Sequence, residues 1–201
     1  SNYIELGIAQ ADLIDAAYQG TGVFTGKKCQ NFKAVASLYP EACQIVVRKD
    51  SDIETIDDLQ GKKVSVGEEE SGSELNARQI LEMSGLPEDL IKTKHLDYTD
   101  AADKLAAGKI DAFFFTAGAQ TTVVEELAKH CDIRLLNLDD KLRGKLTTAY
   151  PFYSDYTIPS GTYTGQEEDI QTVCVQSVLV ASDALDNATV LTNPPYGERL
   201  G

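Results

Sequence analysis

The stretch SVGEEESGSELNARQIL (residues 65–81) carries residues whose types and spacing suit the binding of a small molecule. Ser71 and Glu74 have the spacing of a capping box, which predicts a helix that begins near residue 72. The first turn of a helix presents unpaired backbone N–H groups and a partial positive charge, so a ligand carboxylate could bind there. The same spacing also occurs in ordinary helix caps without a ligand, and spacing alone favours that alternative.

This turn does not fit nucleotide phosphates. Gly67 and Gly72 have the spacing of the pattern Gly-x-x-x-x-Gly-Lys-Ser/Thr, but Ser73 stands where the pattern needs lysine. The three glutamates at 68–70 would repel a triphosphate. The sequence therefore excludes a phosphate-binding loop at this position.

The elements around this turn alternate between strands and helices. A short capped helix is expected over 51–61, where Ser51 and Glu54 have capping-box spacing. Apolar and helical periodicity then predict strands over 62–66, 91–96, 109–116 and 133–138, and helices over 73–85, 100–108, 119–130 and 139–150. This repetition predicts an α/β fold with a mostly parallel sheet and helices on both faces.

The flanks of this alternating region have a different character. A strand is expected over 3–9 and a helix over 10–19, and two β-rich runs at 32–39 and 42–49 are separated by Pro40. The segment 151–165 is rich in Pro, Gly, Ser and Tyr, and a strong strand is expected over 172–182. The flanks therefore resemble parts of a second domain.

Composition narrows the classes of function. The 201 residues carry a formal charge of −14, which disfavours binding to nucleic acids. No apolar run approaches the ~18 residues of a membrane helix. Four cysteines lack Cys-x-x-Cys spacing and only two histidines are present, so no metal site is expected, and either disulfides or free thiols fit the count.

Six stretches in order resemble the TAXI subfamily of substrate-binding proteins, which serve tripartite ATP-independent periplasmic (TRAP) transporters. They are ELGIAQAD (5–12), ASLYPEACQIVVRKDS (36–51), IDDLQGKKVSVG (56–67), SGSELNARQIL (71–81), GKIDAFFFTAGAQT (108–121) and YPFYSDYTIPSGTYTGQEEDIQTVCV (150–175). The resemblance implies a type II periplasmic-binding-protein fold with one complete lobe and part of a second. Residues 45–150 would form the second lobe, and 1–44 with 151–186 the partial first lobe and hinge.

The sequence departs from the family pattern at two places. The family begins with a longer first-lobe segment and ends with further helices, so this chain is expected to be a fragment without a signal peptide. Family members have small neutral residues where this chain has the glutamates at 68–70. We expect these glutamates to point outward, because the Ser-Gly-Ser cap still follows them.

The resemblance implies a set of ligand-binding residues. Some lie at the predicted helix start, some follow the buried FFF run (113–115) at the carboxyl end where α/β sheets place ligands, and others flank the crossings between lobes. The set is Gln10, Tyr39, Glu41, Ser71, Gly72, Ser73, Asn76, Thr116, Ala117, Gly118 and Tyr163. Packing in the hinge is an equal alternative for the tyrosines, and surface hydrogen bonding is one for Gln10 and Glu41.

The tail TNPPYGERLG (192–201) resembles a different family. Asn193-Pro194-Pro195-Tyr196 is similar to a motif of amino-methyltransferases that act on ribosomal RNA guanine. No glycine-rich S-adenosylmethionine loop accompanies it in a suitable place. Residues 187–201 are therefore interpreted as an atypical tail joined to the binding-protein sequence, and a chance Pro-Pro turn is the alternative.

The resemblance implies a non-enzymatic, periplasmic or extracytoplasmic protein. It would capture a small carboxylate, such as glutamate, glutamine or a 2-oxoacid, between two lobes and deliver it to TRAP transporter subunits. No cofactor and no catalytic residue is expected, since no nucleophile or base has a recognisable partner. The alternatives are an RNA methyltransferase fragment and a surface antigen without a small-molecule ligand.

Overall fold

A computed structural model describes residues 6–183 of the chain, so the motif at 193–196 lies outside the described residues. The chain forms two compact units: a larger unit, Pro40–Val175, and a smaller unit built from Ser1–Tyr39 and Gln176–Gly201. The larger unit extends at both ends beyond the 45–150 region assigned to the second lobe. It takes in the first part of the long segment that follows residue 150.

The sheet of the larger unit is mixed. Its strands are β2 (Phe32–Arg48), β3 (Lys63–Ser65), β4 (Lys92–Lys94), β5 (Ala112–Ala117) and β6 (Ile133–Leu135). β3 pairs in parallel with β4 and β5, whereas β2 is antiparallel to both β5 and β6. Val46 of β2 pairs with Phe113 on one side and Leu135 on the other, so β2 lies between β5 and β6.

This arrangement confirms the α/β class and corrects the expectation of a mostly parallel sheet. The strands that alternate with helices do run in one direction, as strand–helix–strand crossovers require. β2 enters the sheet as one long strand without such a crossover, so all of its pairings with them are antiparallel. β2 also runs continuously through Pro40, which was expected to break it; a strand tolerates proline where no ladder hydrogen bond needs its N–H.

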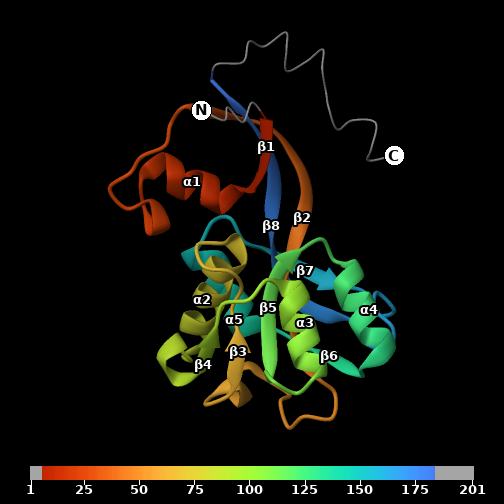
Figure 1. Cartoon of the computed structure of the whole chain (residues 1–201). Coiled ribbons are helices and arrows are strands. Elements are labelled where there is room, and N and C mark those ends of the chain that lie inside the picture. Colours follow the sequence, from red (N-terminus) through yellow and green to blue (C-terminus); the bar gives the residue numbers. More distant parts are fainter. Residues whose placement is uncertain (1–5, 184–201) are drawn as a thin grey trace. The chain divides into compact units, whose positions relative to one another are not determined.

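Helices cover both faces of this sheet, as predicted. They are α2 (Gly72–Ser84), α3 (Tyr98–Ala106), α4 (Thr122–His130) and α5 (Asp140–Ala149). Side chains alternate along β5, so Phe114 packs into the cluster with α2 and α5, while Phe113 and Phe115 pack with α3 and α4. Figure 1 shows these two helix pairs on opposite sides of β5.

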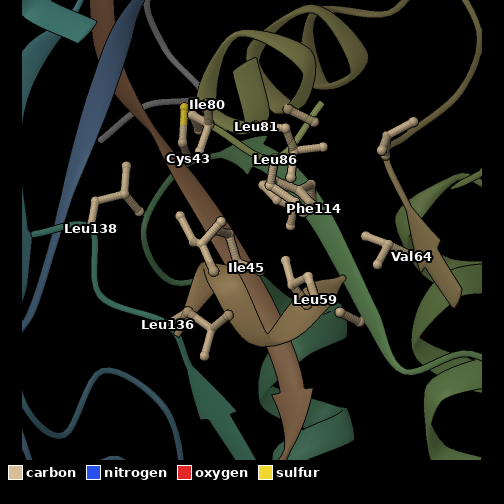
Figure 2. Close-up of a cluster of buried hydrophobic side chains, with 14 of the residues drawn as sticks. Cys43, Ile45, Leu59, Val64, Ile80, Leu81, Leu86, Phe114, Leu136 and Leu138 are labelled. Carbon is tan, nitrogen blue, oxygen red and sulfur yellow. The ribbon is translucent and has the colours of Figure 1, made fainter. Parts of the chain in front are cut away.

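The core on the α2 face is almost fully apolar. Figure 2 shows Ile45, Leu59, Leu81 and Phe114 converging from β2, from the short 3₁₀ helix η2 (Ile56–Leu59), from α2 and from β5. All four side chains are at most 3% exposed. This packing fixes α2 against the sheet and thereby fixes where the helix begins.

Shorter elements complete the larger unit. η2 replaces the helix expected over 51–61, because Thr55 and Asp58 form the capping box instead of Ser51 and Glu54. The remaining elements are η3 (Glu88–Leu90) and β7 (Ser154–Ile158), and β7 is antiparallel to the first part of β8 (Ile170–Ser182). No helix in the described region is both long and apolar enough to cross a bilayer.

The smaller unit contains β1 (Leu6–Gln10), α1 (Ala11–Gln19) and η1 (Gly22–Phe24). β1 pairs in antiparallel register with the second part of β8, from Leu6 opposite Ala181 to Gln10 opposite Ser177. α1 follows β1 directly and ends at Gly20, which adopts the left-handed conformation. All four cysteines of the chain are free thiols.

Candidate functional site

The start of α2 is a capped helix terminus, as the sequence predicts. The Ser71 side chain accepts a hydrogen bond from the Glu74 backbone N–H at 3.1 Å. The Glu74 carboxylate in turn accepts from the Glu70 backbone N–H at 2.5 Å and pairs with Arg78. Glu68, Glu69 and Glu70 are all exposed, which confirms that the acidic loop faces outward.

Gly67 lets the loop after β3 pack closely against this helix start. Its φ is +101°, and a Cβ placed there would lie 3.0 Å from Ser73 Cβ and 3.2 Å from the Glu74 backbone nitrogen. A side chain at this position would therefore be strained and would also press on the first turn of α2. Glycine is needed here for its conformation and for the space.

Two helix starts leave backbone donors available at one edge of the sheet. Among the described residues, the N–H groups of Gly72 and Ser73 have no hydrogen-bond acceptor. Thr121, which precedes α4, makes no side-chain cap. Because α2 follows β3 and α4 follows the parallel neighbour β5, both positive helix ends lie at the carboxyl edge of these strands. This edge can attract and hydrogen-bond an anion.

A chain of buried and partly buried hydrogen bonds fixes β5 to α2. The Thr116 backbone N–H donates to Ser73 Oγ at 3.0 Å, and the Thr116 hydroxyl donates to Asn76 Oδ1 at 3.0 Å. The Asn76 amide nitrogen donates to the Tyr153 hydroxyl at 2.8 Å, which donates to Gln79 Oε1 at 2.5 Å. Asn76 is 1% exposed, so it positions Thr116 from behind the edge of the sheet.

A second, partly buried network fixes the turn between β5 and α4. The Gln44 side-chain nitrogen lies 3.4 Å from the carbonyl oxygens of both Ala117 and Gly118. The Tyr163 hydroxyl lies 2.6 Å from Gln44 Oε1, contacts the Ala119 carbonyl, and accepts from the Thr121 backbone N–H at 3.2 Å. Burial of Tyr163 raises the pKa of its phenol, so the hydroxyl stays protonated and available as a donor.

The structure brings together the predicted residues of the larger unit that follow β3 or lie at the carboxyl end of β5: Ser71, Gly72, Ser73, Asn76, Thr116, Ala117 and Gly118. Tyr163 joins them through the turn before α4; the residue is 2% exposed and its hydroxyl is hydrogen-bonded within the protein. Glu41 lies half-buried in β2. Gln10 and Tyr39 belong to the smaller unit; Gln10 is buried and Tyr39 is 39% exposed.

Two supporting residues were not predicted. Gln44 interrupts the apolar run Ala42 to Val47, and a polar side chain inside a buried strand is a signal that could have identified it. Tyr153 gave no such signal, because its partners Asn76 and Gln79 are more than 70 residues away in sequence. Within residues 6–183, no cluster of three potential metal ligands occurs.

Comparison with known proteins finds a family model that matches most of the chain. The sequence model described as the NMT1-like family matches residues 1–192. The fold is similar to that of the periplasmic aliphatic sulphonate-binding protein SsuA from Escherichia coli, with a TM-score of 0.55, 20% identity and coverage of 98% of this chain. It is also similar to the alkanesulfonate-binding protein SsuA from Xanthomonas axonopodis pv. citri bound to MOPS, with a TM-score of 0.54, 18% identity and 98% coverage.

This chain spans about half of the length of those structures, covering 52% and 53% of them. At these identities the likeness establishes the fold, and the chain has a periplasmic-binding-protein-like architecture.

Proposed function

The chain belongs to the NMT1-like family, and from that membership we propose that it is the ligand-binding part of an extracytoplasmic solute-binding protein. The observation that carries the proposal is the carboxyl edge of β3 and β5, where α2 and α4 begin. Among residues 6–183, the backbone N–H groups of Gly72 and Ser73 have no hydrogen-bond acceptor, while Thr116 behind them is hydrogen-bonded to Ser73 and Asn76. Donors that are already held in place lose little conformational entropy on binding, which favours a small anion.

The chemistry favours binding over catalysis. The hydroxyls of Ser73 and Thr116, beside the open donors, are held by hydrogen bonds, and in the part of the chain that the structure describes no hydrogen-bonded base and nucleophile pair accompanies them. The solved structures that share the fold are named as binding proteins, which agrees with the expectation of a non-enzyme.

The proposed solute is a small carboxylate, such as glutamate, glutamine or a 2-oxoacid. The resemblance to the TAXI subfamily supports this class, and it also supports delivery of the solute to the membrane subunits of a TRAP transporter. A sulfonate is the second candidate, because a sulfonate oxygen can accept the same backbone hydrogen bonds and both similar structures are named for sulfonates. The glutamate side chains at 68–70 are exposed, so we expect them to leave the donors accessible to either anion.

Thermal unfolding with a panel of ligands tests the proposal. L-glutamate, L-glutamine, 2-oxoglutarate and an alkanesulfonate would be added separately, and a carboxylate is expected to raise the melting temperature by mass action. Substitution Ser73→Ala should weaken that effect, because it removes the acceptor that fixes the Thr116 backbone beside the open donors.

Ser84→Ala is the matched control for this substitution. Ser84 lies at the other end of α2 and its hydroxyl donates to the Leu81 carbonyl at 2.7 Å, so it also loses one hydrogen bond. The control should keep the full ligand response. Absence of any response to every anion in the panel, up to millimolar concentration, would contradict the proposed function, whereas a response to the sulfonate alone would change the solute class.

A further inference from the structure

The larger unit contains a cavity of about 250 Å³ between β6 and the loop that joins β7 to β8. Its volume is just below the range of about 300–1,000 Å³ that drug-sized ligands occupy, so it suits one small molecule. None of its lining residues belongs to α2 or α4. They are Lys49, Ile133, Arg134, Leu135, the loop residues 163–168 and Ile170, and all lie within the larger unit.

One wall of the cavity is the free edge of β6. The Leu136 N–H donates to the Ile45 carbonyl of β2 at 3.0 Å. Because hydrogen-bonded pairs alternate along an antiparallel ladder, the backbone groups of Ile133 and Leu135 point away from β2. Among residues 6–183, none of these groups has a hydrogen-bond partner. Leu135 is only 6% exposed, so a partner for its N–H and C=O has to come from the cavity that it lines.

The other wall is the loop, which is held in place by its own hydrogen bonds. The Gln166 side-chain nitrogen donates to the carbonyls of Pro159 and Glu168, both at 3.0 Å. The backbone N–H and the hydroxyl of Thr164 donate to the Glu125 carboxylate of α4 at 2.9 and 2.6 Å. The cavity is therefore largely preformed, which reduces the entropy lost when a ligand binds.

Charged residues of opposite sign line the two walls. Lys49 and Arg134 belong to the side of β2 and β6, whereas Glu167 and Glu168 belong to the loop. In the part of the chain that the structure describes, none of these four residues forms an ion pair. The Arg134 guanidinium is held instead by donating to the Ile53 carbonyl at 2.6 Å. A ligand with one negative and one positive group can pair with both walls at once.

We propose that this cavity binds a small zwitterion with an apolar side chain, such as a free aliphatic amino acid. The ligand carboxylate pairs with Lys49 and accepts from the Leu135 N–H. The ligand ammonium pairs with Glu167 or Glu168 and donates to the Leu135 carbonyl. The aliphatic chain packs against Ile170 and its apolar neighbours in the lining. This second site goes beyond the proposed function, because it uses neither of the helix starts.

Calorimetric titration with three ligands of one carbon skeleton tests the need for both charges. L-leucine carries both, 4-methylpentanoate lacks the ammonium and 3-methylbutylamine lacks the carboxylate. L-leucine should bind about 10- to 100-fold more tightly than either analogue, the factor expected for the loss of a hydrogen bond to a charged group. Equal binding of the three ligands, or no binding of L-leucine at millimolar concentration, would overturn the proposal.

Variants at exposed positions assign each charge to its wall. Lys49→Gln should weaken L-leucine binding about 10-fold and leave 3-methylbutylamine binding unchanged. The double variant Glu167→Gln/Glu168→Gln should weaken L-leucine binding by a similar factor and leave 4-methylpentanoate binding unchanged. Lys109→Gln removes an exposed lysine outside the cavity and should keep the wild-type affinity. Wild-type affinity for L-leucine in both cavity variants would contradict the assignment.

Two-dimensional ¹H–¹⁵N NMR separates this site from the proposed function. L-leucine should shift the amide signals of Ile133 and Leu135 in a saturable manner, and such shifts support the cavity whether or not Gly72 and Ser73 also respond. Shifts confined to Gly72 and Ser73 would overturn the cavity site and leave the proposed function intact.

Discussion

The hydroxyl of Tyr163 should stabilise the larger unit by a measurable amount, because it is the hub of the network that fixes the turn before α4. Substitution Tyr163→Phe keeps the buried ring but removes the partner of the Thr121 backbone N–H and of Gln44 Oε1. Each buried group left unpaired costs about 1–3 kcal/mol. We therefore expect the free energy of unfolding to fall by about 2–4 kcal/mol, allowing for partial relaxation of the turn.

Tyr156→Phe is the matched control within the same unit. Tyr156 is half-buried, and its hydroxyl makes no hydrogen bond to a described residue, so its loss should change stability by less than about 0.5 kcal/mol. Urea unfolding followed by circular dichroism measures both variants against the wild-type protein. A loss for Tyr163→Phe no larger than that of the control would refute the assignment of Tyr163 as the hub.

The pH dependence gives a second readout for Tyr163. Because burial raises the pKa of its phenol, the unfolded chain ionises first as pH rises above about 10. The stability that comes from the protonated hydroxyl is present below that pH and is lost as pH rises toward the folded pKa. The wild-type protein should therefore lose stability more steeply above pH about 10 than Tyr163→Phe does.

Two further substitutions have defined outcomes. Gly67→Ala should lower the free energy of unfolding by at least about 1–2 kcal/mol, because alanine disfavours a positive φ and its Cβ would press on Ser73. Urea unfolding measures this loss, and an unchanged free energy of unfolding would contradict it. The Glu54 and Thr55 backbone N–H groups lower the pKa of Asp58 by donating to its carboxylate, so its stabilising effect is present above pH about 4 and is lost as pH falls. Asp58→Asn should therefore show a shallower acid-induced loss of stability than the wild-type protein, and parallel pH profiles would contradict this.

Local patterns predicted the helix start at which the candidate site lies. The cap of α2 depends only on Ser71 and on the residues that follow within one turn, so its spacing is visible in the sequence. The turn after β5 was also placed correctly, because the buried run at 113–115 marks a central strand. Both features arise from interactions between close neighbours in the chain.

Features that depend on distant partners were not predictable in the same way. The direction of β2 follows from its insertion between β5 and β6, and no periodicity within the strand encodes that choice. Tyr163 was selected from a resemblance, but its hydroxyl partner Gln44 lies 119 residues away in the sequence. Only the fold shows that this tyrosine supports the turn from within the protein.

The central claim is that the open helix starts of α2 and α4 bind a small carboxylate. A titration followed by two-dimensional ¹H–¹⁵N NMR tests it most directly, because each backbone amide reports separately. We predict that adding L-glutamate or 2-oxoglutarate shifts the Gly72 and Ser73 amide signals, and those at the start of α4, in a saturable manner. Saturable shifts that leave these amides unmoved, or no shift at millimolar ligand, would contradict the account.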